Sequence, residues 1–215
     1  MARPKQVLLT RDRIVDAASA LVDAEGLDAL SVRRLAAELG VQGPSLYHHF
    51  ATKADILDAV ADAVIERVDL SAFGRLPWNE ALRGWATSYH AALIAHPNVV
   101  PVLAHGPGRR PRALAMAEAV YGALLEAGWG EARATHIGAL MRYLVTGSAL
   151  GSFALGFDID PALYAEYPHL HRAHRLAAHH EAVDEGAFAL GLDLLISGLQ
   201  TTFDKKRGLV DDLRP

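Results

Sequence analysis

The segment from Gln42 to His48 combines the types of side chain that recognise nucleic acids. Amide, hydroxyl and imidazole groups form hydrogen bonds with base edges, and a tyrosine hydroxyl can donate to a phosphate oxygen. Arg33 precedes the segment and Lys53 follows it, so a cation stands on either side. No residue from 42 to 49 is acidic, whereas a helix surface selected only for solubility usually carries Asp or Glu. We interpret this pattern as a DNA-binding surface, formed by Gln42, Ser45, Tyr47 and His48 with their cationic neighbours.

These residues need a rigid support, and residues 31–50, SVRRLAAELGVQGPSLYHHF, have the spacing of a helix-turn-helix. Ser31 is suited to cap a short helix that Gly40 ends, and Pro44 fits the first turn of a second helix, expected to reach Phe50. In this motif the second helix enters the major groove of DNA. The spacing alone is a weak signal, because many helical hairpins share it. We expect Leu46 and Phe50 to be buried between the helices rather than in contact with DNA.

The rest of the chain also predicts helices, because no long stretch alternates apolar and polar residues as a strand does. Thr10 can cap a first helix, and Thr52 with Asp55 resembles a capping box that opens a fourth helix reaching about Leu70. Later helices are expected over residues 78–96, 111–127, 131–155, 170–182 and 185–207. The prediction is an all-α fold with a three-helix domain at residues 1–55 and a larger helical domain at residues 56–215.

The composition restricts the function. The 215 residues include no cysteine, which excludes a disulfide framework, a thiolate zinc site and a cysteine nucleophile. We see neither a secretory signal nor an apolar run of membrane-spanning length, and expect a soluble cytoplasmic protein. The net charge of −4 argues against a uniformly basic nucleic-acid binder. Residues 1–13 nevertheless carry four basic side chains and one acidic side chain, so a basic arm can follow phosphates, unless it is simply a solvated terminus.

Residues 9–58, LTRDRIVDAASALVDAEGLDALSVRRLAAELGVQGPSLYHHFATKADILD, resemble the DNA-binding region of TetR-family transcriptional regulators. The resemblance implies nine or ten helices, a homodimer on a palindromic operator, and a small molecule that releases the DNA. Carried over by position, the DNA-binding residues are Arg33, Gln42, Gly43, Pro44, Ser45, Tyr47, His48 and Lys53. The spacing to Trp78, the HGPGRRP loop at residues 105–111 and the FALGLDLLISGLQ segment are similar to the tetracycline-repressor subgroup. The resemblance therefore implies a bacterial regulator that is associated with the nucleoid through its function.

Two long helices expected in the C-terminal part are rich in small residues. Gly147, Ser148, Gly151 and Ser152 would share one strip, and Gly191 and Gly198 are seven residues apart in the other helix. A glycine inside a helix costs about 1 kcal/mol relative to alanine, so a close contact should compensate for it. We predict a symmetric four-helix dimer face, with ordinary packing inside one chain as the alternative.

Aromatic and apolar residues in the middle of the chain are candidates for an effector pocket, with plain core as the alternative. Trp85, Tyr89 and Leu93 are spaced four apart on one helix face, and His105, Met116 and Met141 are further candidates. By ungapped alignment Asp69 and Trp85 replace a histidine and an asparagine of the tetracycline site. We therefore expect a different effector, more apolar or aromatic than tetracycline, and no cofactor.

Five histidines lie between His169 and His180 and suggest either a metal site or a pH-sensitive gate. No two of them are four residues apart and no carboxylate has ligand spacing, so we favour a solvated, lid-like segment without metal. No nucleophile elbow, phosphate loop or dinucleotide fingerprint occurs, and we predict no enzyme. The expected function is a ligand-responsive transcriptional regulator, most simply a repressor. The alternative is a helical small-molecule-binding or metal-dependent enzymatic module that keeps the helix-turn-helix as a scaffold.

Overall fold

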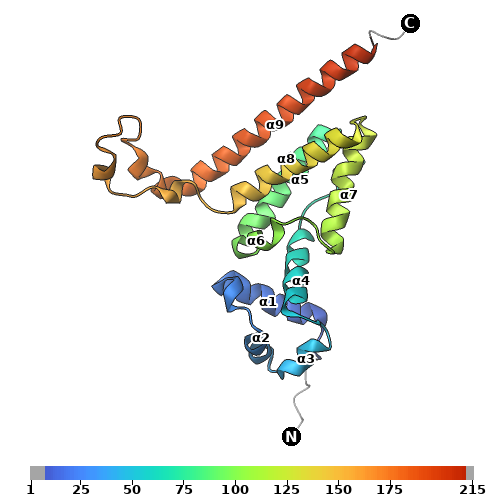
Figure 1. The fold of residues 1–215 in the computed structure, drawn as a ribbon, viewed down its shortest axis with the longest axis vertical. Helices are drawn as coiled ribbons and strands as arrows, with labels where there is room; N and C mark the ends of the chain where they lie inside the picture. Colours follow the sequence, from blue (N-terminus) through green and yellow to red (C-terminus); the bar gives the residue numbers. More distant parts are fainter. Residues whose placement is uncertain (1–7, 212–215) are drawn as a thin grey trace. The chain divides into compact units, whose positions relative to one another are not determined.

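A computed structural model describes residues 8–211, with side chains for residues 8–205. This part of the chain contains nine α-helices and short 3-10 turns but no strand, so the all-α prediction is confirmed (Figure 1). Its residues form two compact units. The first comprises the described residues up to Val68 together with Ala92–Met116, and the second comprises Asp69–Ala91 together with the described residues from Ala117 onward. Arg3 and Lys5 of the expected basic arm lie outside the described residues.

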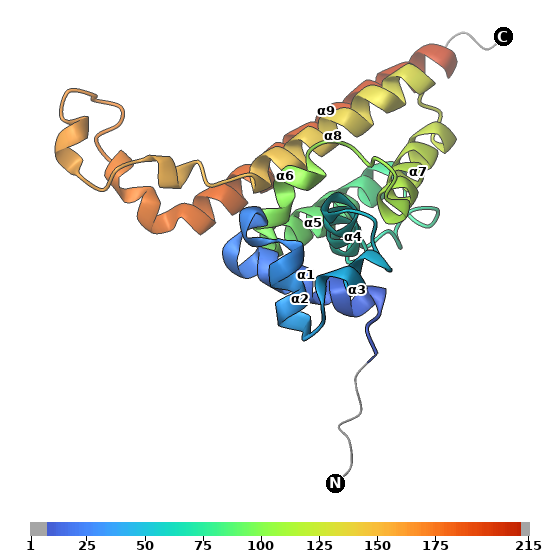
Figure 2. The ribbon, with the colours of Figure 1, turned by 60° about the horizontal axis from the view of Figure 1, so that its bottom comes forward.

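The first unit begins with four helices, α1 (Arg11–Glu25), α2 (Val32–Leu39), α3 (Gly43–Tyr47) and α4 (Lys53–Ile65). Helix α1 packs against both α2 and α4, and α2 packs against α3 (Figure 2). The apolar faces of all four helices meet in one core that includes Ile14, Val22, Leu35, Leu46, Phe50, Ile56 and Val60. Burial of these faces stabilises helices that would be marginal alone, α3 above all.

The expected starts of α1, α2 and α4 and the expected end of α2 are confirmed. The hydroxyl oxygens of Thr10 and Ser31 each accept a hydrogen bond from the third helical amide at 3.2 Å. Gly40 ends α2 in the left-handed conformation, with φ of 67°. Thr52 and Asp55 form the full capping box at the start of α4. Two expected ends are wrong, because α3 stops at Tyr47 instead of Phe50 and α4 stops at Ile65 instead of Leu70.

The remainder of the first unit is the last turn of α5 (Trp78–Ala95), the short α6 (Val100–Leu103) and the first turns of α7 (Pro111–Glu126). Pro97 follows α5 and begins a 3-10 turn, Pro97–Val99, that leads directly into α6. Helix α6 packs against α4, and the 3-10 turn packs against α1. The sequence did not predict α6, which is only one turn long.

The second unit contains the earlier part of α5, the later part of α7, α8 (Glu131–Ala149) and α9 (His180–Asp211). Helices α8 and α9 pack side by side, and a Cβ on Gly191 of α9 would lie 3.0 Å from a methyl group of Leu144 in α8. Gly191 therefore permits packing inside one chain. A Cβ on Gly147 or Gly198 would meet nothing within 4 Å.

The α-helical structure expected for residues 150–155 and for most of residues 170–182 is absent. Helix α8 ends at Ala149, so Gly151 and Ser152 do not extend its strip of small residues. Short 3-10 turns replace the helix expected over residues 170–182, and α9 begins at His180. Prolines interrupt the segment at positions 161 and 168, and most of its large apolar side chains are exposed, with Phe153 at 70% and Ile159 at 75%. Helical periodicity without an apolar face to bury does not make a stable helix.

Candidate nucleic-acid interface

Eight residues predicted to contact DNA lie on and beside α3, and we call them the reading surface: Arg33, Gln42, Gly43, Pro44, Ser45, Tyr47, His48 and Lys53. Gly43 and Ser45 are half-buried and the other six are exposed, Tyr47 by 54%. Leu46 and Phe50 are instead buried, with exposures of 1% and 3%, as expected. One face of α3 therefore holds the helix in place, and its polar side chains are free for hydrogen bonding.

The backbone around α3 fixes this orientation. Gly40 and Val41 donate to the last carbonyl oxygens of α2, which produces the tight turn before α3. The amides of His49 and Phe50 both donate to the carbonyl oxygen of Leu46 at 3.0 Å. Lys53 is the first residue of α4, where the helix dipole also favours a phosphate. The arrangement can present donors to base edges and cations to a phosphate backbone.

A second group of predicted residues, the effector candidates, is divided between the two units. Trp85, Tyr89 and Met141 are buried in the second unit, and the rings of Trp85 and Tyr89 are 5.9 Å apart. Leu93 and Met116 are buried in the first unit. His105 in the first unit is exposed, with Nδ1 3.1 Å from the carbonyl oxygen of Pro101.

Two buried polar atoms of α5 have no hydrogen-bond partner among the described residues, the indole Nε1 of Trp85 and Nε2 of His90. The indole N–H is a donor, whereas Nε2 of a neutral histidine donates or accepts according to the tautomer, and a buried polar atom without a partner is costly in a folded protein. The ring of His90 lies flat against Phe188 of α9, with centroids 3.7 Å apart. Burial lowers the pKa of His90, although the nearby Glu185 opposes that shift.

Comparison with known proteins gives two family matches along the chain. Residues 14–60 match the model of bacterial regulatory proteins of the tetR family, and residues 74–203 match the tetracycline-repressor-like C-terminal domain. A transcriptional regulator of Saccharopolyspora erythraea with the helix-turn-helix motif is 38% identical over 66% of this chain and 60% of that protein. The class C tetracycline repressor of Escherichia coli is 31% identical over 89% of this chain and 91% of that repressor.

Solved structures agree with these relatives. The TetR-family protein ActR of Streptomyces coelicolor, in complex with actinorhodin, superimposes with a TM-score of 0.73. It is 29% identical over 92% of this chain and 99% of that structure.

The chain belongs to the TetR family. It is a helix-turn-helix transcriptional regulator of the ligand-responsive type and not an enzyme, as the sequence predicted.

In this TetR-family chain, three contacts around α1 and α4 had no signal in the sequence. His96 Nδ1 lies 2.9 Å from a carboxylate oxygen of Asp23, and its Nε2 contacts the guanidinium of Arg67. Asn98 donates to the carbonyl oxygens of Val22 and Asp23 at the end of α1. These bonds join the C-terminal end of α1 to the residues that follow α5.

Acidic residues spaced three or four apart on α4 contact the start of α7. Asp62 is 6% exposed and accepts hydrogen bonds from the amides of Arg112 and Ala113, at 3.0 and 3.1 Å. The guanidinium of Arg112 donates to Glu66 at 2.7 Å, which raises the pKa of Arg112. A side chain of α4 thus caps α7, a role that helix capping usually gives to the residue just before the helix.

A cleft of about 750 Å³ opens within the first unit among α1, α4 and residues 109–112. Six carboxylates and four arginines line it, so its charges are largely balanced. No group of three or more histidine or carboxylate side chains in the described part of the chain could hold a metal ion, the segment from His169 to His180 included. No described helix is long and apolar enough to cross a membrane.

Proposed function

We propose that this regulator binds a palindromic DNA operator as a homodimer through the reading surface, and that a small-molecule effector releases it. In this proposal residues 1–55 bind DNA, and residues 56–215 bind the effector and form the dimer. The observation that carries it is the exposed, acid-free face of α3, whose opposite face is buried. A repressor of this kind acts where the chromosome is, so we place it in the cytoplasm, at the nucleoid.

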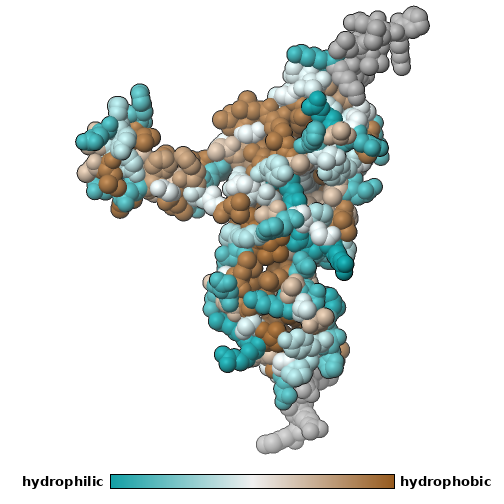
Figure 3. Space-filling view, in the orientation of Figure 1, coloured by the Kyte–Doolittle hydropathy of each residue, from teal (hydrophilic) through white to brown (hydrophobic). Residues whose placement is uncertain are grey.

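Exposed apolar side chains on α8 and α9 support the dimer. Leu140 and Tyr143 of α8 are 47% and 71% exposed, and Leu190 and Leu194 of α9 are 61% and 66% exposed. Apolar surface gathers over α9 in the space-filling view (Figure 3). Large apolar patches of this kind usually mark a protein interface. The two helices would pack against the same pair of the second subunit.

The effector class follows from the chemistry of the candidates. We propose a flat aromatic molecule that stacks on Trp85 and Tyr89 and offers an acceptor to the unpartnered indole N–H of Trp85. The relative ActR is known in complex with actinorhodin. Tetracycline fits less well, because Asp69 and Trp85 stand where the tetracycline site has a histidine and an asparagine by ungapped alignment. Met141 of the same unit remains a proposed effector contact, whereas the candidates Leu93, His105 and Met116 belong to the first unit.

Operator binding by paired variants tests the DNA assignment. The probe is a duplex that the wild-type protein selects from a random-sequence library. We expect Tyr47→Ala combined with Lys53→Ala to abolish specific binding. The double variant lacks a hydroxyl that can donate a hydrogen bond to a DNA phosphate, and it lacks a cation of the reading surface. Glu38→Gln, an exposed change in α2 outside that surface, should bind as the wild type does. Wild-type affinity in a folded double variant would contradict the assignment.

A further inference from the structure

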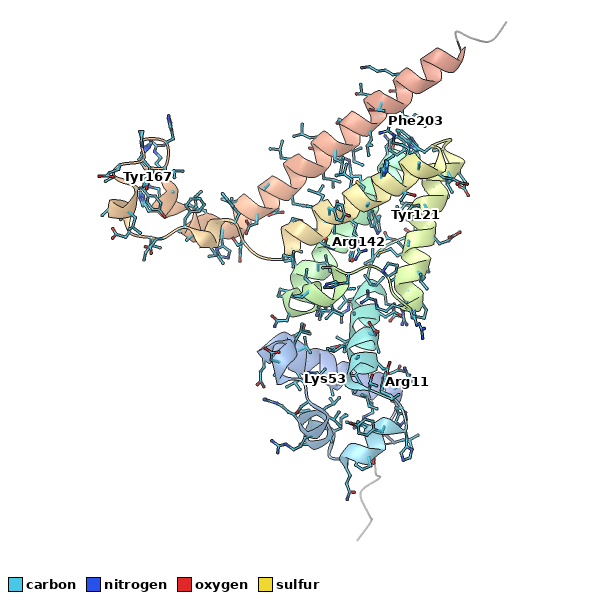
Figure 4. The ribbon with its side chains drawn as sticks, in the orientation of Figure 1. Arg11, Lys53, Tyr121, Arg142, Tyr167 and Phe203 are labelled. Carbon is cyan, nitrogen blue, oxygen red and sulfur yellow. The ribbon has the colours of Figure 1, made fainter. Side chains whose placement is uncertain are left out.

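Arg11, the first residue of α1, reaches the turn that connects α3 with α4 (Figure 4). Its guanidinium carbon lies 4.0 Å from the centroid of the Phe50 ring, and Nη1 donates to the carbonyl oxygen of His49. The guanidinium thus contacts both residues that follow His48. A cation over an aromatic ring and a charged donor to a carbonyl are both favourable.

The turn that Arg11 contacts determines where α3 can point. Helix α3 has five residues, too few to be stable without support from its surroundings. The capping box of Thr52 and Asp55 holds the α4 side of the turn. Arg11 holds the α3 side, because His49 and Phe50 are also the residues whose amides bond to Leu46. Arg11 thus contacts the residues that directly follow Tyr47 and His48, although it lies 38 residues from His49 in the sequence.

We propose that Arg11 is a positioning residue for DNA recognition: it orients α3 through Phe50 and the His49 carbonyl, and makes no essential contact with DNA. This inference rests on the proposed operator binding. The competing explanation is that Arg11, which is exposed, simply binds a phosphate. The two explanations differ in what they predict for non-specific DNA and for salt.

Losing a phosphate contact weakens specific and non-specific binding alike and lowers the salt slope by about one. Losing an orienting contact should weaken specific binding alone, because only base readout needs the correct direction of α3. The matched variants are Arg11→Lys, which keeps the charge but not the planar group, and Arg11→Met, which keeps only the length. Lys53→Met serves as the reference for a phosphate contact.

The experiment measures affinity of the full-length protein for the selected operator and for a scrambled duplex of equal length, over a range of salt. We expect both Arg11 variants to lose about tenfold in operator affinity, with unchanged scrambled-duplex affinity and salt slope. Lys53→Met should weaken both duplexes and lower the slope by about one. The inference fails if Arg11→Lys binds as the wild type does while Arg11→Met lowers the slope.

A measurement without DNA separates this inference from the proposed function. Amide hydrogen exchange at His49 and Phe50 should become about tenfold faster in Arg11→Met, because the turn opens more often once its clamp is gone. The amide of Ile56, which bonds to Thr52 within α4, should exchange at its normal rate. Unchanged exchange at all three amides would overturn the positioning role even if the wild-type protein binds its operator. If exchange at His49 and Phe50 is faster in Arg11→Met but the wild-type protein binds no operator, the positioning role stands and the proposed function is contradicted.

Discussion

His90 lies against Phe188 with its Nε2 buried, and burial makes its charged form unfavourable. The lowered pKa means that the unfolded chain takes up a proton at a higher pH than the folded chain does. The free energy of unfolding should therefore fall as the pH drops below about 6.5, the ordinary histidine value, and stop falling below the pKa of the folded state.

His90→Phe keeps a ring against Phe188 and cannot take up a proton. We expect the variant to lose less stability than the wild type between pH 7 and about pH 5. Urea unfolding at several pH values measures the difference directly. Parallel stability curves for the two proteins would show that His90 does not titrate in this way.

At the level of single residues, the sequence predicted what local pattern controls. The apolar spacing predicted that Leu46 and Phe50 are buried, and both are. The polar, acid-free pattern around α3 predicted that Tyr47 is exposed on the reading surface, and it is. The roles of Arg11 and Asp62 were not predictable, because each depends on a partner about 40 or 50 residues away that only the folded chain brings near. Contacts between residues so far apart leave no periodicity in a single sequence.

Helices α4 and α7 are connected by one buried carboxylate. Asp62→Ala leaves the amides of Arg112 and Ala113 without their acceptor, and we expect a loss of about 3 kcal/mol. Asp58→Ala removes a neighbouring carboxylate whose side chain is 58% exposed and 3.6 Å from Arg110, and should cost less than about 1 kcal/mol. Chemical denaturation compares the two. Equal losses would mean that the capping of α7 by Asp62 contributes little.

Among the elements, the helices that bury an apolar face were predicted well, and α5 and α7 end within one residue of the expected positions. The capped starts of α1, α2 and α4 match expectation, because each is encoded within four residues. The segment between α8 and α9 differs from the prediction, because its small and apolar residues are typical of a helix but most of its large apolar side chains are exposed. Packing decides such segments, and packing is not visible in local sequence.

For the whole molecule, the proposed dimer makes a direct prediction about α9. Leu190 and Leu194 are one helical turn apart, and both are exposed in the single chain. Replacing both with Glu should place two charges in the interface and convert the dimer into a monomer, since buried unpaired charges are very unfavourable. Light scattering after size exclusion gives the mass, and circular dichroism checks that the helices remain. A variant that stays dimeric would move the interface elsewhere.

The three tryptophans of the sequence, Trp78, Trp85 and Trp129, are all buried, and all belong to the second unit. Trp78 and Trp129 pack together with Phe203, with ring centroids 5.2 to 5.5 Å apart, whereas Trp85 lies beside Tyr89. The first unit contains no indole at all among its residues. Tryptophan fluorescence of the unlabelled protein thus comes entirely from the unit that contains Trp85 and Tyr89, and an aromatic compound stacked on Trp85 would quench the part of it that Trp85 emits.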